Sequence, residues 1–262
     1  MTRVRFEAGD DGVGLVTLDR PDKLNALDEE TFAGLASAAR QAGDAAAAQT
    51  VRCVLLTGAG RAFCSGLDVS LFGGQVGQAP DDAWIASLQE AFTAFEDLPV
   101  PTVAALHGAV LGGGLQLALA CHLRLVTPDA QLGLLETRWG IIPDLGATYR
   151  LPRLIGLSRA VDLAVSARTI DGQTALDWGL ADAALPADDV AGAARAYARR
   201  LAAGPTLATG AIPRLMREAL AAPRDAALAA ERSTQARCLA SADFAEAVRA
   251  ALAGEQPAFQ GR

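Results

Sequence analysis

Three consecutive glycines stand directly before an apolar segment that carries one amide side chain. Gly112, Gly113 and Gly114 follow the β-favouring run 102–106, and Gln116 lies three residues after Gly113. A turn built from glycine lets a ligand approach the backbone closely, because no Cβ is in the way. The first N–H groups of a helix that begins there have no intrahelical partner and stand at the positive end of its dipole. Such groups could hold an anion, or an oxygen that becomes anionic during a reaction. The alternative is a glycine-rich turn that only joins a strand to a helix.

Two carboxyl groups in a segment of otherwise apolar or small residues could transfer protons. Glu136 and Asp144 both lie in the stretch 135–156. Two carboxyls in a nearly dry pocket push their pKa values apart, which suits one base and one acid. The alternatives are structural: Glu136 could form an ion pair with Arg138, and Asp144, which follows a proline, could shape a turn.

Alternating patterns of strands and helices predict an α/β fold. Strands are expected over 13–19, 51–56, 102–106 and 123–126, and helices over 29–41, 82–97, 115–121 and 171–178. Asp28, just before the first helix, has the type and position of an N-cap. The pattern alone does not separate a doubly wound sheet from a spiral of ββα turns.

The glycine-rich loop 57–68 follows a predicted buried strand and resembles a nucleotide-binding loop only superficially. Phe63 stands where the third glycine of the dinucleotide pattern belongs, and no GK[ST] sequence is present. We therefore expect neither a dinucleotide site nor a P-loop. The Gly/Gln-rich segment 73–80 is expected to be mobile, and residues 73–84 are expected to form part of the pocket wall.

Composition limits the possible partners. The 262 residues are 51% apolar and 20% charged, which is typical of a globular protein with a substantial core. The net charge of −7 argues against nucleic-acid binding, which needs a basic face. Two histidines and four cysteines, without CxxC or His/Cys pairing, predict neither a metal site nor a disulfide framework. No signal-peptide pattern and no apolar run long enough for a membrane span are present, so a cytoplasmic location is expected.

The C-terminal quarter of the chain reads as helical. Residues 195–262 contain several Ala-rich amphipathic segments, which we expect to be broken at Pro205, Pro213 and Pro223. They have too little apolar bulk to fold alone, so packing on the body or on a neighbouring subunit is expected. The predicted division is a core over 1–194 and a helical oligomerisation region over 195–262.

Six blocks of the sequence together resemble the crotonase superfamily, the enoyl-CoA hydratase/isomerase family. They cover nearly the whole chain in the family's order and read RPDKLNAL (20–27), GRAFCSGLD (60–68), HGAVLGGGLQLALAC (107–121), LETRWGIIPDLGAT (135–148), ARTIDGQTALDWGL (167–180) and FQGR (259–262). The resemblance implies a spiral of ββα units with a helical C-terminal trimerisation region, often assembled as a dimer of trimers. It also implies an acyl-CoA thioester as the ligand, with no cofactor beyond the CoA that the substrate carries.

The resemblance also assigns roles to individual residues. The family's oxyanion hole uses two backbone N–H groups, which map to Leu67 and Gly113, and the latter is one of the glycines singled out above. The implied CoA-contacting residues are Lys23, Ala26, Ala62, Ser65, Leu67, Asp68, Val69, Ser70 and Gly113.

The acid/base positions depart from the pattern of typical hydratases in this family. Of the two glutamates that hold water in those enzymes, the second maps to Glu136 and the first to Gln116, which cannot transfer a proton. Asp144 matches a catalytic aspartate of dienoyl-CoA isomerases. It also matches the nucleophile of 4-chlorobenzoyl-CoA dehalogenases, but those carry a tryptophan at the Glu136 position.

We therefore predict an enzyme that isomerises the double bond of an enoyl- or dienoyl-CoA. In this prediction Glu136 is the base, and Asp144 is the second acid/base group or tunes Glu136. The first alternative is an enoyl-CoA hydratase in which Gln116 positions the water. A non-catalytic acyl-CoA-binding scaffold is the alternative from another class.

Overall fold

The structure, a computed structural model, describes residues 2–73 and 81–261. Residues 74–80, which were expected to be mobile and to form part of the pocket wall, lie outside the described residues. Within them, no helix combines the length and the apolar character needed to cross a membrane.

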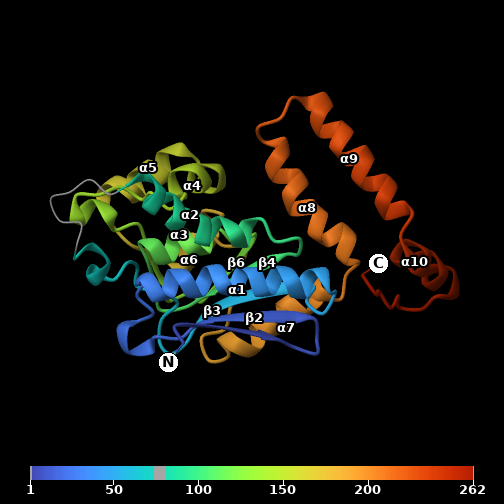
Figure 1. Cartoon of the computed structure of the whole chain (residues 1–262), viewed down its shortest axis with the longest axis horizontal. Coiled ribbons are helices and arrows are strands. Elements are labelled where there is room, and N and C mark those ends of the chain that lie inside the picture. Colours follow the sequence, from blue (N-terminus) through green and yellow to red (C-terminus); the bar gives the residue numbers. More distant parts are fainter. Residues whose placement is uncertain (1, 74–80, 262) are drawn as a thin grey trace.

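The core of the molecule is a six-stranded sheet with the order β1-β2-β3-β4-β6-β9 (Figure 1). Only the first pair, β1 with β2, is antiparallel. The strands span Val4–Ala8 (β1), Val13–Leu18 (β2), Cys53–Gly58 (β3), Thr102–Leu106 (β4), Leu123–Val126 (β6) and Ala183–Ala184 (β9). The middle strands β3 and β4 are almost entirely buried, as expected for parallel strands covered on both faces.

A second, smaller sheet shows that the fold is a spiral rather than a doubly wound sheet. It contains β5 (Ala109–Leu111), β7 (Gln131–Gly133) and β8 (Ile170–Asp171). β5 directly follows β4 and β7 directly follows β6, so each turn of the chain gives one strand to each sheet. Isolated bridges between Cys64 and Val110 and between Leu27 and Leu67 extend this arrangement to the two earlier turns. The predicted spiral of ββα units is confirmed.

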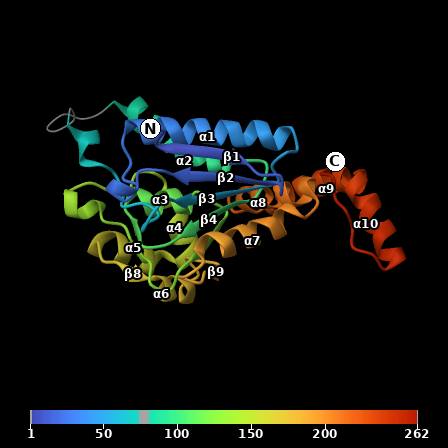
Figure 2. The same ribbon diagram turned by 90° about the horizontal axis from the view of Figure 1, so that it is seen from below.

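Helices cover both faces of the large sheet. α1 (Glu29–Ala47) and α2 (Asp82–Glu96) lie on one face, and α7 (Val190–Ala202) lies on the other (Figure 2). Asp28 caps α1 as predicted, since its carboxylate accepts the Thr31 N–H at 2.9 Å. Phe32 of α1 stacks on Phe92 of α2 with 5.6 Å between ring centroids, which joins the two helices over the sheet.

Short helices follow the strands of the second sheet and surround the candidate site. They are α3 (Gly113–Leu119), α4 (Ala147–Ile155), α5 (Leu157–Ser166) and α6 (Gly172–Asp177), with three 3₁₀ turns, η1 (Pro21–Lys23), η2 (Val69–Phe72) and η3 (Glu136–Trp139). All seven residues of α3 are buried, which agrees with the buried helix predicted over 115–121.

The last three helices extend away from the body: α8 (Thr206–Ala219), α9 (Arg224–Leu239) and α10 (Ala242–Ala253) (Figure 1). The boundary predicted at 194/195 falls inside α7, whose Ala194, Ala198 and Ala202 pack against the sheet, so the extension begins with α8. Pro213 lies inside α8. The break expected at Pro213 is therefore wrong. Proline removes one backbone N–H donor, and the helix continues without that one hydrogen bond.

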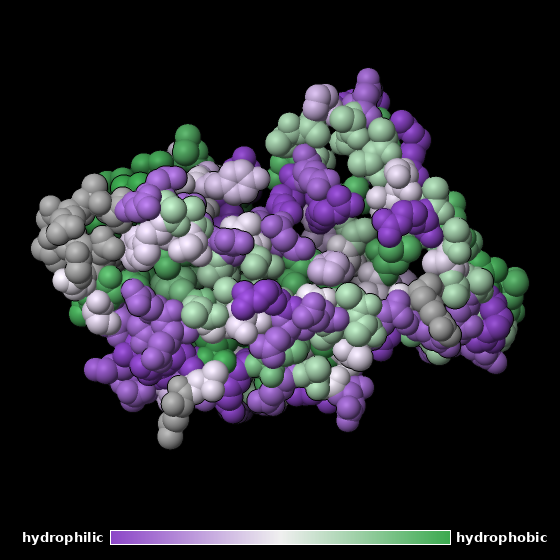
Figure 3. All heavy atoms as spheres, viewed as in Figure 1, coloured by the Kyte–Doolittle hydropathy of each residue, from purple (hydrophilic) through white to green (hydrophobic). Residues whose placement is uncertain are grey.

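The C-terminal segment runs back to the body. Asp243, buried at the start of α10, accepts the N–H groups of Gln260 at 2.7 Å and Gly261 at 2.9 Å. Arg52, just before β3, donates to the Phe259 carbonyl at 3.0 Å. Several large apolar side chains of the extension remain exposed (Figure 3). Assembly into trimers or hexamers stays a prediction.

Candidate active site

Glu136 and Gln116 lie next to each other in the buried interior of the protein. Glu136 is the first residue of η3 and is 5% exposed, and Gln116 lies on the first turn of α3 and is fully buried. The amide nitrogen Nε2 of Gln116 donates a hydrogen bond to Oε1 of Glu136 at 2.8 Å. The structure thus brings together the two residues that occupy the acid/base positions.

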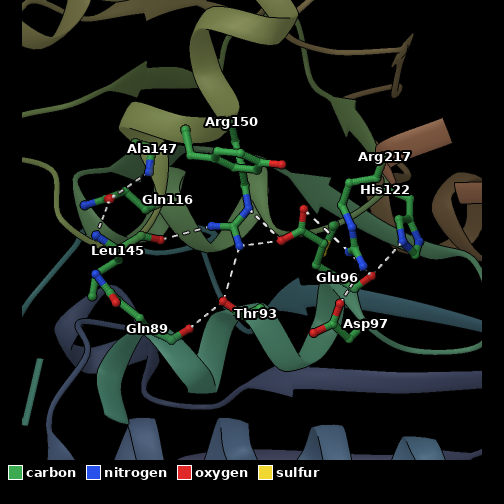
Figure 4. A network of polar contacts seen from close by, with 12 residues as sticks. Gln89, Thr93, Glu96, Asp97, Gln116, His122, Leu145, Ala147, Arg150 and Arg217 are labelled. Atoms are coloured by element: carbon green, nitrogen blue, oxygen red, sulfur yellow. Dashed lines mark hydrogen bonds and ion pairs between the residues drawn. The ribbon is translucent and has the colours of Figure 1, made fainter. Parts of the chain in front are cut away.

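The amide of Gln116 is held in one orientation by the main chain. Its Oε1 accepts the N–H of Leu145 at 2.8 Å and the N–H of Ala147 at 3.3 Å (Figure 4). Only the oxygen of an amide can accept these bonds, so Nε2 must be the atom that faces Glu136. The oxygen of Gln116 therefore has both of its acceptor positions occupied, and the second N–H of its nitrogen has no acceptor among the described residues.

Glu136 lacks a cationic partner among the described residues. Burial raises the pKa of the Glu136 carboxyl, the negative charge of Asp144 raises it further, and the Gln116 donor acts in the opposite direction. Its second oxygen, Oε2, is buried without a hydrogen-bond partner within the described part of the chain. The structural alternative of an ion pair with Arg138 is not present, since that guanidinium donates to the carbonyl of Ala167 at 2.5 Å.

Asp144 lies in the loop between η3 and α4 and is half-buried. Burial raises the pKa of its carboxyl above the ordinary value. Its backbone carbonyl accepts a hydrogen bond from Gln89 of α2 at 2.6 Å, which ties the loop to that helix. The charge of Asp144 reaches Glu136, so the two carboxyls lie in one region, and their division into one base and one acid stays a prediction.

Leu67 and Gly113, the two residues whose N–H groups are expected to form the oxyanion hole, lie next to each other. The N–H of Leu27 bonds the Gly66 carbonyl and the N–H of Asp68 bonds the Leu27 carbonyl, both at 2.8 Å. The N–H of Leu67, between those two peptide groups, therefore points to the opposite side of its strand. Gly113 is the first residue of α3, so its N–H has no intrahelical acceptor. A Cβ built on Gly113 would lie 3.3 Å from Leu67 Cδ2, which shows how near the two residues are.

Each of these two N–H groups follows a glycine whose backbone conformation most other residues cannot adopt. Gly112 has a φ of +51° and Gly66 a φ of +102°, which side chains rarely permit. A Cβ on Gly112 would lie 3.3 Å from Oε1 of Glu136. The glycine turn therefore brings the main chain at Gly112, directly before the first residue of α3, against the buried carboxyl.

Apart from Gly113 of α3, the residues that the resemblance assigned to CoA come from two adjacent segments. The N–H of Ser65 bonds the Leu24 carbonyl at 2.9 Å, which joins 62–70 to the loop that contains Lys23 and Ala26. Lys23, Val69 and Ser70 are exposed, whereas Ala62 is 2% exposed and presents little side-chain surface.

The carboxylate of Asp68, unlike that of Glu136, has a cationic partner. Its carboxylate accepts the Ser70 N–H at 2.9 Å and the Arg20 guanidinium at 2.6 Å. These hydrogen bonds, those from Ser70 foremost, lower the pKa of Asp68 to about 2. Asp68 thus stays ionised over the physiological range.

Asn25, which the sequence did not single out as functional, shapes this loop. Asn25, 1% exposed, accepts the Arg20 N–H at 2.9 Å and donates to the carbonyls of Ala59 at 2.9 Å and Ala62 at 2.8 Å. It also adopts a φ of +58°, which asparagine tolerates better than most residues. An asparagine flanked by apolar residues in a loop was the available signal, but its distant partners could not be read from it.

Comparison with known proteins places the chain in a family. A family model described as "Enoyl-CoA hydratase/isomerase" matches residues 8–262. A Rhodobacter capsulatus protein named "Probable enoyl-CoA hydratase" is 36% identical over 99% of this chain and 98% of its own length. The Escherichia coli "1,2-epoxyphenylacetyl-CoA isomerase" is 34% identical over 96% or more of both chains. A cucumber β-oxidation multifunctional protein is 40% identical over 75% of this chain, but the match spans 27% of that longer protein.

Solved structures agree with this result. A Bacillus anthracis enoyl-CoA hydratase superposes with a TM-score of 0.91 and 28% identity, covering 99% of this chain and all of that one. A Thermobifida fusca protein in complex with CoA, named as a candidate enoyl-CoA hydratase, superposes with a TM-score of 0.82 and 32% identity over 91% and 93% of the two chains. The chain therefore belongs to the enoyl-CoA hydratase/isomerase family of the crotonase superfamily and is an enzyme, a lyase or an isomerase.

Proposed function

We propose that this enzyme isomerises the double bond of an enoyl- or dienoyl-CoA by moving a proton between carbon atoms of the acyl chain. The observation that carries the proposal is the state of Glu136: one oxygen is held by Gln116 at 2.8 Å, and the other is buried with no partner in the described chain. A carboxyl of raised pKa and with one free oxygen suits the removal and return of a proton.

The proposed reaction needs an electron sink next to the base. Glu136 Oε2 takes a proton from the acyl chain, and the electron pair moves onto the thioester oxygen to form a dienolate. The N–H groups of Leu67 and Gly113 would stabilise that oxygen, an interaction that typically contributes about 3–4 kcal/mol per donor. Glu136 then returns the proton to another carbon, so the double bond shifts and the enzyme is unchanged. Asp144 would serve as the second acid/base group or tune Glu136.

Hydration of a 2-enoyl-CoA is the second candidate, favoured by relatives that are named as hydratases. Gln116 has one N–H left for a water, but its oxygen already accepts two backbone N–H groups. It cannot act as the second acid/base group, whose loss typically costs about 10²–10⁴-fold in rate. Gln116→Glu should therefore raise hydration of crotonyl-CoA and give it a new pH dependence, because the two carboxyls would then share one site.

Binding and assembly complete the proposal. We propose that CoA lies along 62–70 and the loop that contains Lys23 and Ala26; that a CoA thioester is the ligand is supported by the Thermobifida fusca relative, which is named as a complex with CoA. The proposed reaction needs no metal and no cofactor beyond the CoA of the substrate, and the protein is proposed to act in the cytoplasm as a homotrimer or a hexamer.

A panel of 2-enoyl-, 3-enoyl- and dienoyl-CoA thioesters, followed by product analysis, tests the function. Double-bond isomers as the main products are expected, with slower formation of 3-hydroxyacyl-CoA. Incubation in D₂O separates either enzyme from a non-catalytic acyl-CoA-binding scaffold, because only an enzyme exchanges protons of the acyl chain. Fast hydration without isomerisation, or no exchange with any thioester, would overturn the proposal.

A further inference from the structure

Arg150, on the first turns of α4, is buried against the loop that carries Asp144. Arg150 is 8% exposed, and its Nη1 donates a hydrogen bond to the Leu145 carbonyl at 3.1 Å. A Cβ on Gly146, which has a φ of +97°, would lie 2.0 Å from Nη1. Only glycine fits at that position, so the guanidinium lies directly on the main chain of the loop.

The main chain of the loop that carries Asp144 forms hydrogen bonds with three different side chains. The N–H of Leu145 bonds Oε1 of Gln116 at 2.8 Å, and the carbonyl of the same residue accepts from Arg150 (Figure 4). Gln89 holds the neighbouring carbonyl, that of Asp144, at 2.6 Å. Leu145 thus connects a buried cation to the amide that orients Glu136.

Arg150 is itself fixed by an acid on α2. Its Nε and Nη2 donate to Oε2 of Glu96 at 3.0 Å and 2.6 Å, and Nη2 also donates to the Thr93 hydroxyl at 3.4 Å. The paired side chains are 8% and 14% exposed, so this two-point contact is well shielded from solvent. On the other side, Arg217 of α8 donates to the Glu96 carbonyl at 2.8 Å and to Asp97 at 2.6 Å.

We propose that Arg150, held by Glu96, is a positioning residue for the proton-transfer site. It fixes the Leu145 peptide, which fixes the amide of Gln116 and so the orientation of the Glu136 carboxyl. Among the described residues the hydrogen bonds of Arg150 go to Glu96, Leu145 and Thr93, so it acts on Glu136 only through the loop. The proposal rests on the proposed function only in taking Glu136 as the group that transfers protons.

The test compares Arg150→Met with Arg153→Met. Arg153 lies one turn later on the same helix, is exposed, and has its hydrogen bond and its cation–π contact with Tyr149 of that helix, so it is a matched control. Arg150→Met should lower kcat by about 10- to 100-fold and change KM less than about threefold, because a small misplacement of a reacting group has effects of this size. Its pH–rate profile should move to higher pH, because losing the Gln116 donor raises the pKa of Glu136.

A second measurement does not depend on any activity. Hydrogen exchange at the amides of Leu145 and Ala147 should become faster in Arg150→Met and stay unchanged in Arg153→Met. Glu96→Gln, which keeps the side-chain size, should show the same changes to a smaller extent and serves if Arg150→Met does not fold. If the wild type isomerises nothing, the proposed function fails, but the exchange measurement still tests the positioning.

Two results would overturn the inference. One is a folded Arg150→Met or Glu96→Gln protein in which exchange at Leu145 and Ala147 is as slow as in the wild type. The other is faster exchange with an unchanged kcat and an unchanged pH profile, since the loop would then have moved without any effect on Glu136.

Discussion

Asp68 and Glu136 are two carboxylates of the same candidate site with opposite surroundings. Asp68 lies against the Arg20 guanidinium at 2.6 Å and accepts the Ser70 N–H, which together hold its pKa at about 2. Glu136 is more deeply buried, has a neutral amide as its partner, and has a raised pKa caused first by that burial. The first group stays charged at physiological pH, whereas the second has a pKa above the ordinary value of a glutamate.

The comparison of the two carboxylates shows that an amide partner can orient a buried carboxyl without the strong lowering of its pKa that a cation causes. A guanidinium beside a buried carboxylate would orient it but would also favour its charged form and lower its pKa. The Gln116 amide orients Glu136 with a neutral donor, so the effect of burial on the pKa persists. The loop proposed to bind CoA needs a fixed shape, and the proposed base needs a movable proton. Each carboxylate has the partner that suits that need.

Removing the titratable group should have the largest effect on turnover. Glu136→Gln should lower kcat by at least about 100-fold with nearly unchanged affinity for an acyl-CoA, because a general base is lost while packing is kept. Single-turnover rates and equilibrium binding of a CoA thioester measure the two quantities. A folded variant with wild-type kcat would show that Glu136 is not the base.

The same variant has a stability consequence of known sign. A carboxyl whose pKa is raised on folding contributes stability below its unfolded pKa, and that contribution is lost as the pH rises toward the folded pKa. Glu136→Gln should therefore be at least as stable as the wild type at neutral pH, with the advantage shrinking at acidic pH. Urea unfolding across that range checks it.

Removing a backbone donor should have the next largest effect. Gly113→Pro deletes one N–H at the first position of α3, where proline is well tolerated, and its ring would press on the ends of the Leu27 and Leu67 side chains. Gly113→Ala makes the same Cβ contacts but keeps the N–H. Turnover of the proline variant should fall about 10²–10³-fold below that of the alanine variant. Equal kcat values in two folded proteins would exclude Gly113 from the oxyanion hole.

Neutralising the neighbouring carboxyl should have a smaller effect. Asp144 raises the pKa of Glu136 through its charge, so Asp144→Asn should move the pH–rate profile to lower pH. If Asp144 only tunes the base, kcat at the new optimum should fall less than about tenfold, well short of the effect of losing a general acid. A loss as large as that of Glu136→Gln would make Asp144 the partner acid instead.

Local patterns in the sequence predicted the parts of the fold that local interactions build. The glycine turn, the buried α3, the Asp28 cap and the positions of β2, β3, β4 and β6 follow from neighbouring residues, whereas β1, β5, β7, β8 and β9 were not predicted. The spiral was implied by the resemblance and is confirmed by the alternation of strands between two sheets.

Contacts between distant segments could not be predicted in the same way. Gln116 reaches Leu145, and Arg150 reaches Glu96, across 29 and 54 positions. Nothing in the local sequence distinguishes Arg150 from the exposed Arg153 on the same helix. Pro213 failed as a helix breaker for the related reason that a single missing hydrogen bond can be outweighed by packing along the rest of α8.

The smallest expected effect on turnover is at the carboxylate that stays charged at physiological pH. Asp68→Asn keeps an oxygen for the Ser70 N–H but loses the ion pair with Arg20, which still has Asp28 at 3.3 Å. We expect a kcat close to that of the wild type, a raised KM for acyl-CoA, and a loss of about 1 kcal/mol in stability at pH 7, since the pair is only partly buried. Because the pKa of Asp68 is lowered from 3.8 to about 2 on folding, its contribution is present above pH 4 and is lost as the pH falls toward 2. Urea unfolding of wild type and variant should thus give a difference at pH 7 that narrows at pH 3. A difference that stays constant, or a kcat that falls as much as in Asp144→Asn, would mean that the charge of Asp68 acts on the chemistry rather than on the shape of the loop.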